Sequence, residues 1–214
     1  MGVAELDEEK MLLALKARII CYGDEASQAI SEEIALNIET AWNETHALIN
    51  IKGIDYRGYF KIQGIFAPGL QPEEVYENTD PHNNYFRVEV FAHTDISFVD
   101  GIGSNTGYFK LANLGPSSTT AAHEFGHTLG LLHPENMDIR DAGIPGIMYP
   151  RGTLTRPEFQ YDPNVPAGTV GGTLNPVHRK VLQQDWDLLH MNKLPFKNNL
   201  AVVGAFSSVW HNRH

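Results

Sequence analysis

Apolar residues recur at helical spacing in two segments near the N-terminus. Residues 5–20 predict a short amphipathic helix with acidic residues at its front, and its apolar positions are Leu6, Met11, Leu12, Leu15 and Ile19. Residues 24–44 predict a longer helix of about five turns. Its apolar stripe comprises Ala26, Ile30, Ile34, Ile38, Ala41 and Trp42. The chain is therefore expected to begin with two helices.

The period of the pattern changes in the next part of the chain. Residues 59–66 and 85–91 are rich in aromatic and β-branched residues with partial alternation, which predicts two strands. The stretch between them, residues 68–84, predicts a long surface loop. A glycine-rich turn at residues 100–107 precedes a further short strand, predicted at residues 108–112.

The second half of the chain combines predicted helices with an irregular region. Residues 117–132 predict a long helix, with Ser117 and Ser118 as candidate N-caps after Pro116. Residues 134–174 contain many glycines and prolines without a clear period, so an irregular lobe is expected there.

The C-terminal region begins with a helix-start pattern. Asn175 followed by Pro176 predicts an N-cap and first helical residue. The apolar positions that follow predict a helix to about Met191. Residues beyond Lys193 show no pattern that predicts an element.

Composition favours one globular domain and limits the classes of molecule that are expected as partners. The 214 residues are 42% hydrophobic and 20% charged, and 16 Lys and Arg against 26 Asp and Glu leave a net charge of −10, which disfavours nucleic acid. Cys21 is the only cysteine, which excludes an intrachain disulfide and a cysteine-rich zinc module. The chain shows no signal-peptide pattern, and no apolar run reaches the roughly 18 residues of a membrane span.

One motif carries chemistry, the string His-Glu-Phe-Gly-His-Thr-Leu-Gly-Leu-Leu-His from His123 to His133. On a helix, His123 and His127 lie about 40° apart on one face, so two imidazoles can share one ion. Catalytic zinc sites take three protein ligands and leave one position open. A left-handed turn at Gly130 would bring His133 back as the third ligand.

Glu124 is the candidate general base of this motif. It follows the first ligand, so it would face the water-bearing position, activate the zinc-bound water and carry its proton to the leaving amine. A core helix with incidental histidines is the alternative interpretation. The five defined positions of the motif argue against that alternative.

The string from His123 to His133 resembles the long zinc motif of the metzincin metalloproteases, which have a methionine turn beneath the metal. The segment Gly146-Ile147-Met148-Tyr149-Pro150 resembles that turn in its matrixin version. The resemblance implies that Met148 forms an apolar base under the imidazoles without binding zinc. A methionine that only packs in a loop core is the alternative.

The resemblance implies an α+β, metzincin-type zincin fold: a twisted mixed β-sheet with long helices and a small irregular C-terminal lobe that ends in a helix. Residues 1–214 are expected to form a single metalloprotease catalytic domain. The upper lobe is expected at about 22–133 and the lower lobe at about 134–192. Residues 1–21 are expected to be an N-terminal extension, and residues 193–214 a tail.

The resemblance also implies how a substrate binds. In this family an extended substrate pairs with the edge strand of the sheet through backbone hydrogen bonds. Residues 107–113 are expected to be that edge. Residues 150–163, including Tyr161, are expected to form a wall of the pocket for the side chain after the scissile bond.

The sequence also departs from the family's pattern. Matrixins often carry a structural zinc and calcium, and His93 and Asp95 partly resemble that segment, but the histidines expected further along are missing. A structural zinc or calcium there is one interpretation, and hydrogen-bonded loop residues are the other. A latency role for Cys21 or Asp24 is weighed against a buried cysteine and a helix N-cap. Pro150 stands where some metzincins have a tyrosine ligand.

The leading hypothesis for function is a zinc-dependent endopeptidase with one catalytic Zn²⁺ that cleaves extended protein or peptide segments. It is expected to be a monomer that is secreted, or delivered as an effector outside the producing cell. The acidic composition favours basic substrates. A peptide-binding module on a metzincin scaffold and a zinc amidase for non-peptide amides are the alternatives. The other histidines are expected in surface or core roles: His46, His82, His178, His190, His211 and His214.

Overall fold

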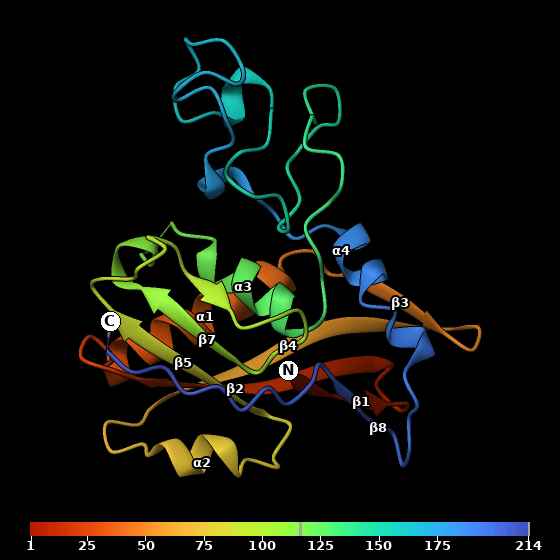
Figure 1. Ribbon diagram of the computed structural model, residues 1–214. Coiled ribbons are helices and arrows are strands. Elements are labelled where there is room, and N and C mark those ends of the chain that lie inside the picture. The colour runs from red at the N-terminus through yellow and green to blue at the C-terminus, as the bar shows by residue number, and fades with distance from the viewer. Residues whose placement is uncertain (116, 214) are drawn as a thin grey trace.

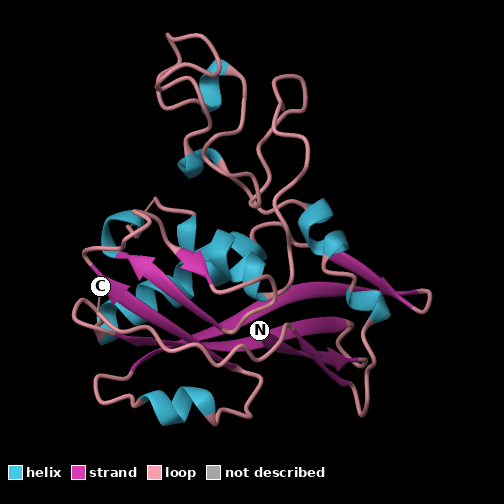
Figure 2. Ribbon diagram, in the orientation of Figure 1, coloured by secondary structure: helices cyan, strands magenta, loops and turns pink. Residues whose placement is uncertain are grey.

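The computed structural model describes residues 1–115 and 117–213, so Pro116 and His214 lie outside the described residues. The fold is α+β, as expected from the sequence. Figure 1 shows a curled mixed sheet with two helices on one face, one short helix on the other, and an irregular lobe that projects from the helical side. Figure 2 shows that this lobe consists almost entirely of loops.

The sheet has eight strands. They are β1 (Gly2–Asp7), β2 (Leu12–Tyr22), β3 (Leu48–Ile51), β4 (Ile54–Phe66), β5 (Asn83–Glu89), β6 (Phe98–Val99), β7 (Thr106–Lys110) and β8 (Leu200–Val203). Their order is β3-β4-β2-β5-β7-β6, and β1 pairs with both β2 and β8. Strand β2 runs parallel to β4 and β5, and β5 runs parallel to β7. The β1–β2, β1–β8, β3–β4 and β6–β7 pairs are antiparallel.

Helices cover both faces of the sheet. Helix α1 (Gln28–Asn43) and helix α3 (Thr120–Thr128) share one face, where they enclose the main hydrophobic core. Helix α2 (Pro72–Tyr76) lies across the other face, where its Val75 packs in a second cluster. Helix α4 (Gln183–Leu188) packs beside β3. In the part of the chain that the structure describes, no helix combines the length and apolar character that crossing a membrane requires.

The predicted helix at residues 5–20 is wrong. This segment forms β1 and most of β2, and β2 lies near the middle of the sheet. Its apolar residues occupy both faces of the strand: Ile19 and Cys21 face the main core, and Ile20 and Tyr22 face α2. A strand that is buried on both faces loses its alternation, so a short run of it is easily read as helical.

Residues 1–21 and 193–214 are accordingly not an extension and a tail. Strands β1 and β2 build the sheet from the first segment, and β8 from the second pairs with β1. The upper lobe therefore includes both ends of the described chain, and the boundary expected at residue 22 falls at the end of a central strand.

The two predicted helices of the second half are shorter than expected. Helix α3 begins at Thr120 and ends at Thr128, and the Ser118 hydroxyl accepts a hydrogen bond from the Thr120 amide at 3.1 Å. The last helix is interrupted: short 3₁₀ turns at Pro176–His178 and Met191–Lys193 flank α4. Arg179 has an extended backbone between the first turn and α4.

The helix predicted at residues 24–44 is confirmed as α1, with a different N-cap. The Ser27 hydroxyl accepts a hydrogen bond from the Ile30 amide, so Asp24 is not the cap. The strands predicted at 59–66 and 85–91 are confirmed within β4 and β5, although β5 ends at Glu89. The predicted loop at residues 68–84 contains α2.

An aromatic cluster joins α1, α3, α4 and β4. Trp42 of α1 stacks on Phe60 of β4 with ring centroids 4.7 Å apart, and Trp186 of α4 meets both rings edge-on. The Trp42 indole donates a hydrogen bond to the Ala122 carbonyl of α3 at 3.2 Å. Trp186 in turn donates to the Trp42 carbonyl at 3.3 Å. This cluster sets the position of α3 over the sheet.

The irregular region expected at residues 134–174 from its glycines and prolines is present, and the irregular lobe extends to residue 180. It is held by isolated backbone bridges, such as Asp138 to Leu154 and Gln160 to Leu174, rather than by a core of its own. The Gly146 to Lys180 bridge joins an inner segment of the lobe to its C-terminal end. A short 3₁₀ turn at Pro157–Phe159 is its one named element besides the turn at Pro176–His178 among the described residues.

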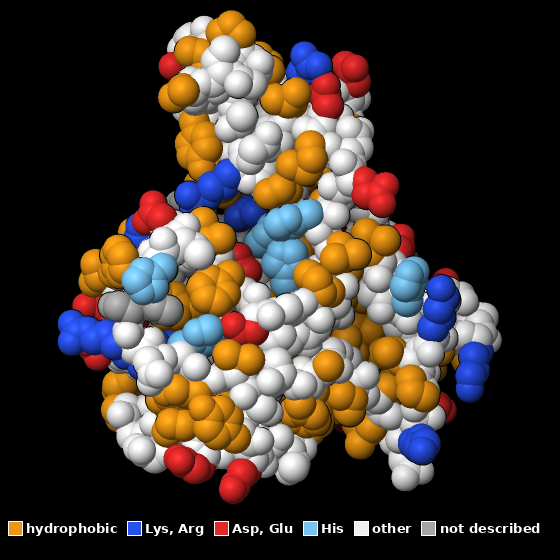
Figure 3. Space-filling model, viewed as in Figure 1, with side chains coloured by type: hydrophobic (Ala, Val, Ile, Leu, Met, Phe, Trp, Pro, Cys, Tyr) orange, Lys and Arg blue, Asp and Glu red, His pale blue; other side chains and the backbone are white. Residues whose placement is uncertain are grey.

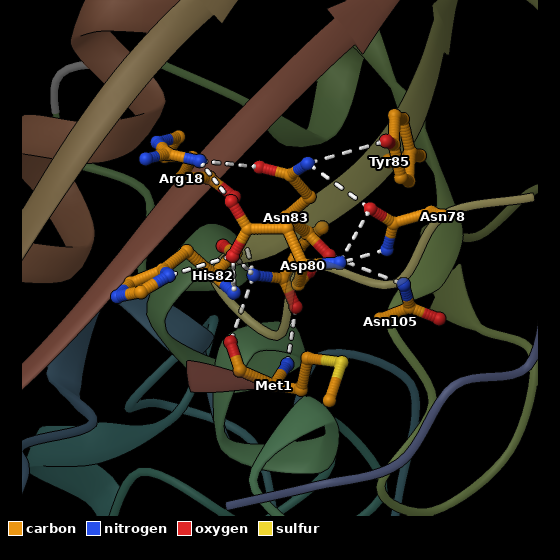
Figure 4. A network of polar contacts seen from close by, with 9 residues as sticks. Met1, Arg18, Asn78, Asp80, His82, Asn83, Tyr85 and Asn105 are labelled. Atoms are coloured by element: carbon orange, nitrogen blue, oxygen red, sulfur yellow. Dashed lines mark hydrogen bonds and ion pairs between the residues drawn. The ribbon is translucent and has the colours of Figure 1, made fainter. Parts of the chain in front are cut away.

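A polar network ties the start of the chain to the loop before β5 (Figure 4). The Asp80 carboxylate accepts hydrogen bonds from the Arg18 guanidinium at 2.6 Å and from the His82 amide at 3.0 Å. The Asn84 amide group bonds both the nitrogen and the carbonyl of Met1. The hydrogen bonds from His82 and Arg18 lower the pKa of Asp80 to about 2, chiefly through the His82 amide.

We predict that Asp80→Asn lowers stability only where the carboxylate is charged. Because its folded pKa lies below its unfolded value, Asp80 stabilises the fold above pH 4, and this contribution is lost as the pH falls toward 2. The side chain is 40% exposed, so we expect a loss below about 1 kcal/mol at pH 7. Urea unfolding at pH 7 and pH 3 measures it, and an equal loss at both values would contradict a charge effect.

We predict that Gly64→Ala destabilises the protein strongly. A Cβ on Gly64 of β4 would lie 2.1 Å from the Ser31 carbonyl oxygen of α1, so the helix would have to move off the sheet. The expected loss is at least about 2 kcal/mol, measured by chemical denaturation. Gly69→Ala is the matched control, because no atom lies within 4 Å of its Cβ position. Similar losses in both variants would refute the close helix–sheet approach.

Candidate metal centre

Helix α3 places the first two histidines of the motif on one face, as the spacing predicts. Both side chains are buried, and their rings lie at a centroid distance of 4.8 Å. The Nε2 atoms of His123 and His127 each lie 3.1 Å from the Nε2 atom of His133. The three histidines thus converge on one point through the same ring nitrogen.

Gly130 makes this convergence possible. Its φ of +101° is the left-handed conformation expected from the sequence. Helix α3 ends at Thr128, and Gly130 reverses the chain two residues later. The chain then turns back, so His133 approaches the two helical histidines. His133 is exposed, whereas His123 and His127 are buried, so the centre opens to solvent on the His133 side.

Two backbone carbonyls set the tautomers of the buried histidines. The Nδ1 atom of His123 lies 2.7 Å from the Ile147 oxygen, and Nδ1 of His127 lies 2.7 Å from the Leu131 oxygen. A carbonyl only accepts, so Nδ1 of His127 carries the proton and its Nε2 presents a lone pair. Nδ1 of His123 lies between the Ile147 carbonyl and Nη1 of Arg179, which only donates, at 2.8 Å; the tautomer that donates to Ile147 is the one that leaves Nε2 free for a metal. Lone pairs at 3.1 Å repel unless a proton or a cation lies between them. The group can hold a metal ion.

The surroundings favour neutral imidazoles, the form that binds metals. Burial, together with the Arg179 cation, lowers the pKa of His123 well below its usual value. Burial also lowers the pKa values of His127 and His133. All three side chains therefore stay uncharged at neutral pH without a metal.

Glu124 lies beside the centre and is buried, with 7% of its surface exposed. Burial raises its pKa to about 8 in the metal-free protein, and the nearby Arg179 cation opposes the shift. No described residue donates a hydrogen bond or forms an ion pair with its carboxylate. Both Glu124 and the three histidines line one open cleft, so the carboxylate can reach a molecule bound there.

Met148 lies directly under α3. A Cβ on Gly126 would come within 2.5 Å of the Met148 sulfur, so the absence of a side chain at Gly126 lets the methionine pack against the helix between the two ligands. Met148 is buried, and the preceding Ile147 supplies the carbonyl that binds His123. The segment that resembles a methionine turn therefore supports the centre from below.

The cleft has a volume of about 710 Å³ and runs between the sheet and the irregular lobe. Figure 3 shows histidine side chains in this hollow, with basic side chains next to them. Its upper-lobe wall comes from β6 and its flanks, including Ile96, Phe98, Val99 and Ile102. Its other wall comes from Pro150, Arg151, Gly152 and Arg179.

The structure corrects the expected edge strand. Residues 107–113 overlap β7, which is paired on both sides, with β5 and with β6. The edge is β6, whose two residues were too short a run to predict. The expected wall at residues 150–163 is present in part, because Pro150 to Gly152 line the cleft and Tyr161 does not.

Arg179 is a residue of this site that sequence reasoning missed. Its side chain is buried, donates from Nε to the Thr119 hydroxyl at 2.8 Å and from Nη1 to the Tyr149 carbonyl at 3.2 Å, and lines the cleft. Burial lowers its pKa to about 10, so it remains a cation at neutral pH. It lies 56 positions after His123, and no local pattern connects the two.

The other sequence candidates lie elsewhere. Asp95 pairs with Lys110, and His93 packs against Phe91, so the described residues do not form the second metal site considered at His93 and Asp95. Cys21 is buried in the main core, which raises the pKa of its thiol to about 12 and separates it from the cleft. Asp24 pairs with Arg213 at 3.1 Å. Neither Cys21 nor Asp24 lines the cleft.

The comparisons with known proteins add nothing to this geometry. No model of a protein family matches the sequence, and no curated protein matches it.

We predict that the chelator-treated protein binds one Zn²⁺ or Co²⁺ per chain. His133→Ala should lower the affinity by more than about 100-fold, because a change outside the ligands already costs about 10- to 100-fold. Titration calorimetry gives stoichiometry and affinity, and the visible spectrum of Co²⁺ reports coordination. His178→Ala, half-buried outside the centre, is the control. Equal affinities in the two variants would rule out this centre.

Proposed function

We propose that this protein is a zinc-dependent endopeptidase of the metzincin type. The observation that carries the proposal is the convergence of three Nε2 lone pairs beside a buried glutamate, within an open cleft. The support from Met148 and from the left-handed Gly130 agrees with the resemblance of the motif.

The donor set fits zinc. Three neutral imidazoles and one open position make up a common catalytic zinc site, and ligands about 2.0–2.1 Å from a tetrahedral ion lie about 3.3 Å apart. The two Nε2 distances of 3.1 Å are close to that spacing. When bound, zinc supplies a Lewis acid that polarises the scissile carbonyl and increases the acidity of water.

Glu124 moves the proton in the proposed reaction. Its carboxylate takes a proton from the attacking water and delivers that proton to the nitrogen of the leaving amine. Its burial excludes competing water from the carboxylate, and the Arg179 cation stabilises the charged form that the first step needs. The chain therefore supplies ligands, base and proton carrier without a covalent intermediate.

The cleft suits an extended peptide. Strand β6 is the last strand of the sheet order, so one of its sides is not paired in the sheet, and its residues line the cleft. A substrate strand can pair with such an edge through its backbone. The apolar side chains of Ile96, Phe98 and Ile102 provide contact surface beside it. We propose a protein or peptide substrate for this reason; a monomeric state and action outside the producing cell remain predictions.

We predict that Glu124→Gln abolishes peptide cleavage while metal binding persists. Loss of the base should lower kcat/KM by about 10²- to 10⁴-fold, and the three ligands remain in place. Digestion of a diverse peptide library by zinc-loaded protein, read by mass spectrometry, measures it beside zinc content. Glu135→Gln is the control, because Glu135 does not line the cleft. Equal cleavage by wild type and Glu124→Gln would contradict the proposal, and tight peptide binding without turnover would favour a binding module.

A further inference from the structure

We propose that the cleft recognises a carboxylate of the substrate close to the reacting bond, and that the guanidinium of Arg179 binds it. The inference rests on the proposed function and names the substrate class of that site. The carboxylate belongs to an Asp or Glu side chain or to the C-terminus of a peptide. The acidic composition of the chain predicts the opposite preference, for basic substrates.

Arg179 is a buried cation that forms no ion pair among the described residues, although the Glu124 carboxylate is near enough to raise its pKa. Arg87, Arg140 and Arg156 each form an ion pair with a carboxylate, whereas Arg179, of which 5% is exposed, forms none. A buried charge is costly unless it is paired. A cation in the wall of an open cleft can therefore bind an anion that enters from solution.

The hydrogen bonds of Arg179 leave part of its guanidinium available. Nε is used by Thr119 and Nη1 by the Tyr149 carbonyl. Nη1 also lies 2.8 Å from Nδ1 of His123, but that nitrogen carries its own proton toward Ile147, so it accepts nothing from Arg179. No described residue accepts a hydrogen bond from Nη2. This atom is the donor that the proposal assigns to the substrate carboxylate.

A second cation lines the same cleft. Arg151 is exposed, and its Nη2 atom bonds the Asn113 side chain at 3.0 Å. The two arginines are close enough for the Arg151 charge to lower the pKa of Arg179. Glu124 is the only acidic residue among the described residues that line the cleft. The local charge is thus positive at the lobe wall although the chain as a whole carries a net charge of −10.

Arg179 also lies near Glu124, which suggests an alternative role for Arg179: to keep the Glu124 carboxylate ionised. If its charge served only to keep Glu124 ionised, its removal would slow the cleavage of every substrate by the same factor. If it binds the substrate, its removal acts on acidic substrates alone. The ratio of kcat/KM between matched acidic and neutral peptides separates the two roles, because a general loss of activity cancels in the ratio.

The test compares peptides that differ only by Asp against Asn, or Glu against Gln, at each position around the cleaved bond. Each is made with a free or an amidated C-terminus, which separates a side-chain carboxylate from a terminal one. We expect zinc-loaded wild type to prefer the carboxylate at one position by about 10- to 100-fold, the range for a charged hydrogen bond. No preference at any position or terminus would overturn the inference.

Variants then show which residue causes the preference for a carboxylate. Arg179→Gln should remove it, Arg179→Lys should retain part of it, and Arg151→Gln should reduce it, while Arg156→Gln is the control outside the cleft. Circular dichroism checks folding, because Arg179 also holds Thr119 and Tyr149. If Arg179→Gln does not fold, Arg179→Lys and Arg151→Gln still decide. An unchanged preference in both would overturn the inference.

Binding separates this inference from the proposed function. Affinities of the same peptides for zinc-loaded Glu124→Gln, measured by fluorescence anisotropy, need no turnover. Tighter binding of the carboxylate peptides, lost in the Glu124→Gln, Arg179→Gln double variant, would support recognition even if the wild type cleaved nothing. Cleavage without any such difference in binding or in kcat/KM would support the peptidase and refute the carboxylate preference.

Discussion

The contact of Trp42 with its neighbours is the interaction on which the site depends. One indole of α1 stacks on Phe60 of the sheet, meets Trp186 of α4 edge-on and donates a hydrogen bond to Ala122 of α3. Ala122 immediately precedes His123, so this bond fixes the helix at the residue before the first ligand. Large aromatic surfaces of this kind dominate the packing energy of a core. The histidines are held on a helix that cannot shift without disrupting three other elements.

This rigid support keeps groups together that would separate in water. The Nε2 lone pairs repel one another, and Arg179 is a buried cation that forms no ion pair among the described residues. Each is costly alone, and each becomes favourable when the right ligand arrives, a cation for the nitrogens and an anion for the guanidinium. In the proposed function, a metal site and an anion site would thus lie side by side in the cleft.

Several elements could be predicted from the sequence, and the failures have physical causes. Helix α1 has one buried stripe and one exposed face, so its period is clear. Strand β2 is buried on both faces between parallel neighbours, so its apolar residues do not alternate regularly and their spacing resembles that of a helix. Strand β6 has only two residues. Its pairing with β7, and not a pattern in its sequence, makes it a strand. Strand β8 exists because β1 is available as its partner.

The sequence by itself determined the candidate metal ligands, because helical spacing puts His123 and His127 on one face and Gly130 permits the turn that brings back His133. These are local relations within eleven residues. Only the tertiary structure decided what surrounds them. The Ile147 carbonyl that fixes the His123 tautomer, the Met148 sulfur under Gly126 and the Arg179 cation beside Glu124 come from distant segments. Contacts of that kind depend on how elements pack, and no spacing along the chain encodes them.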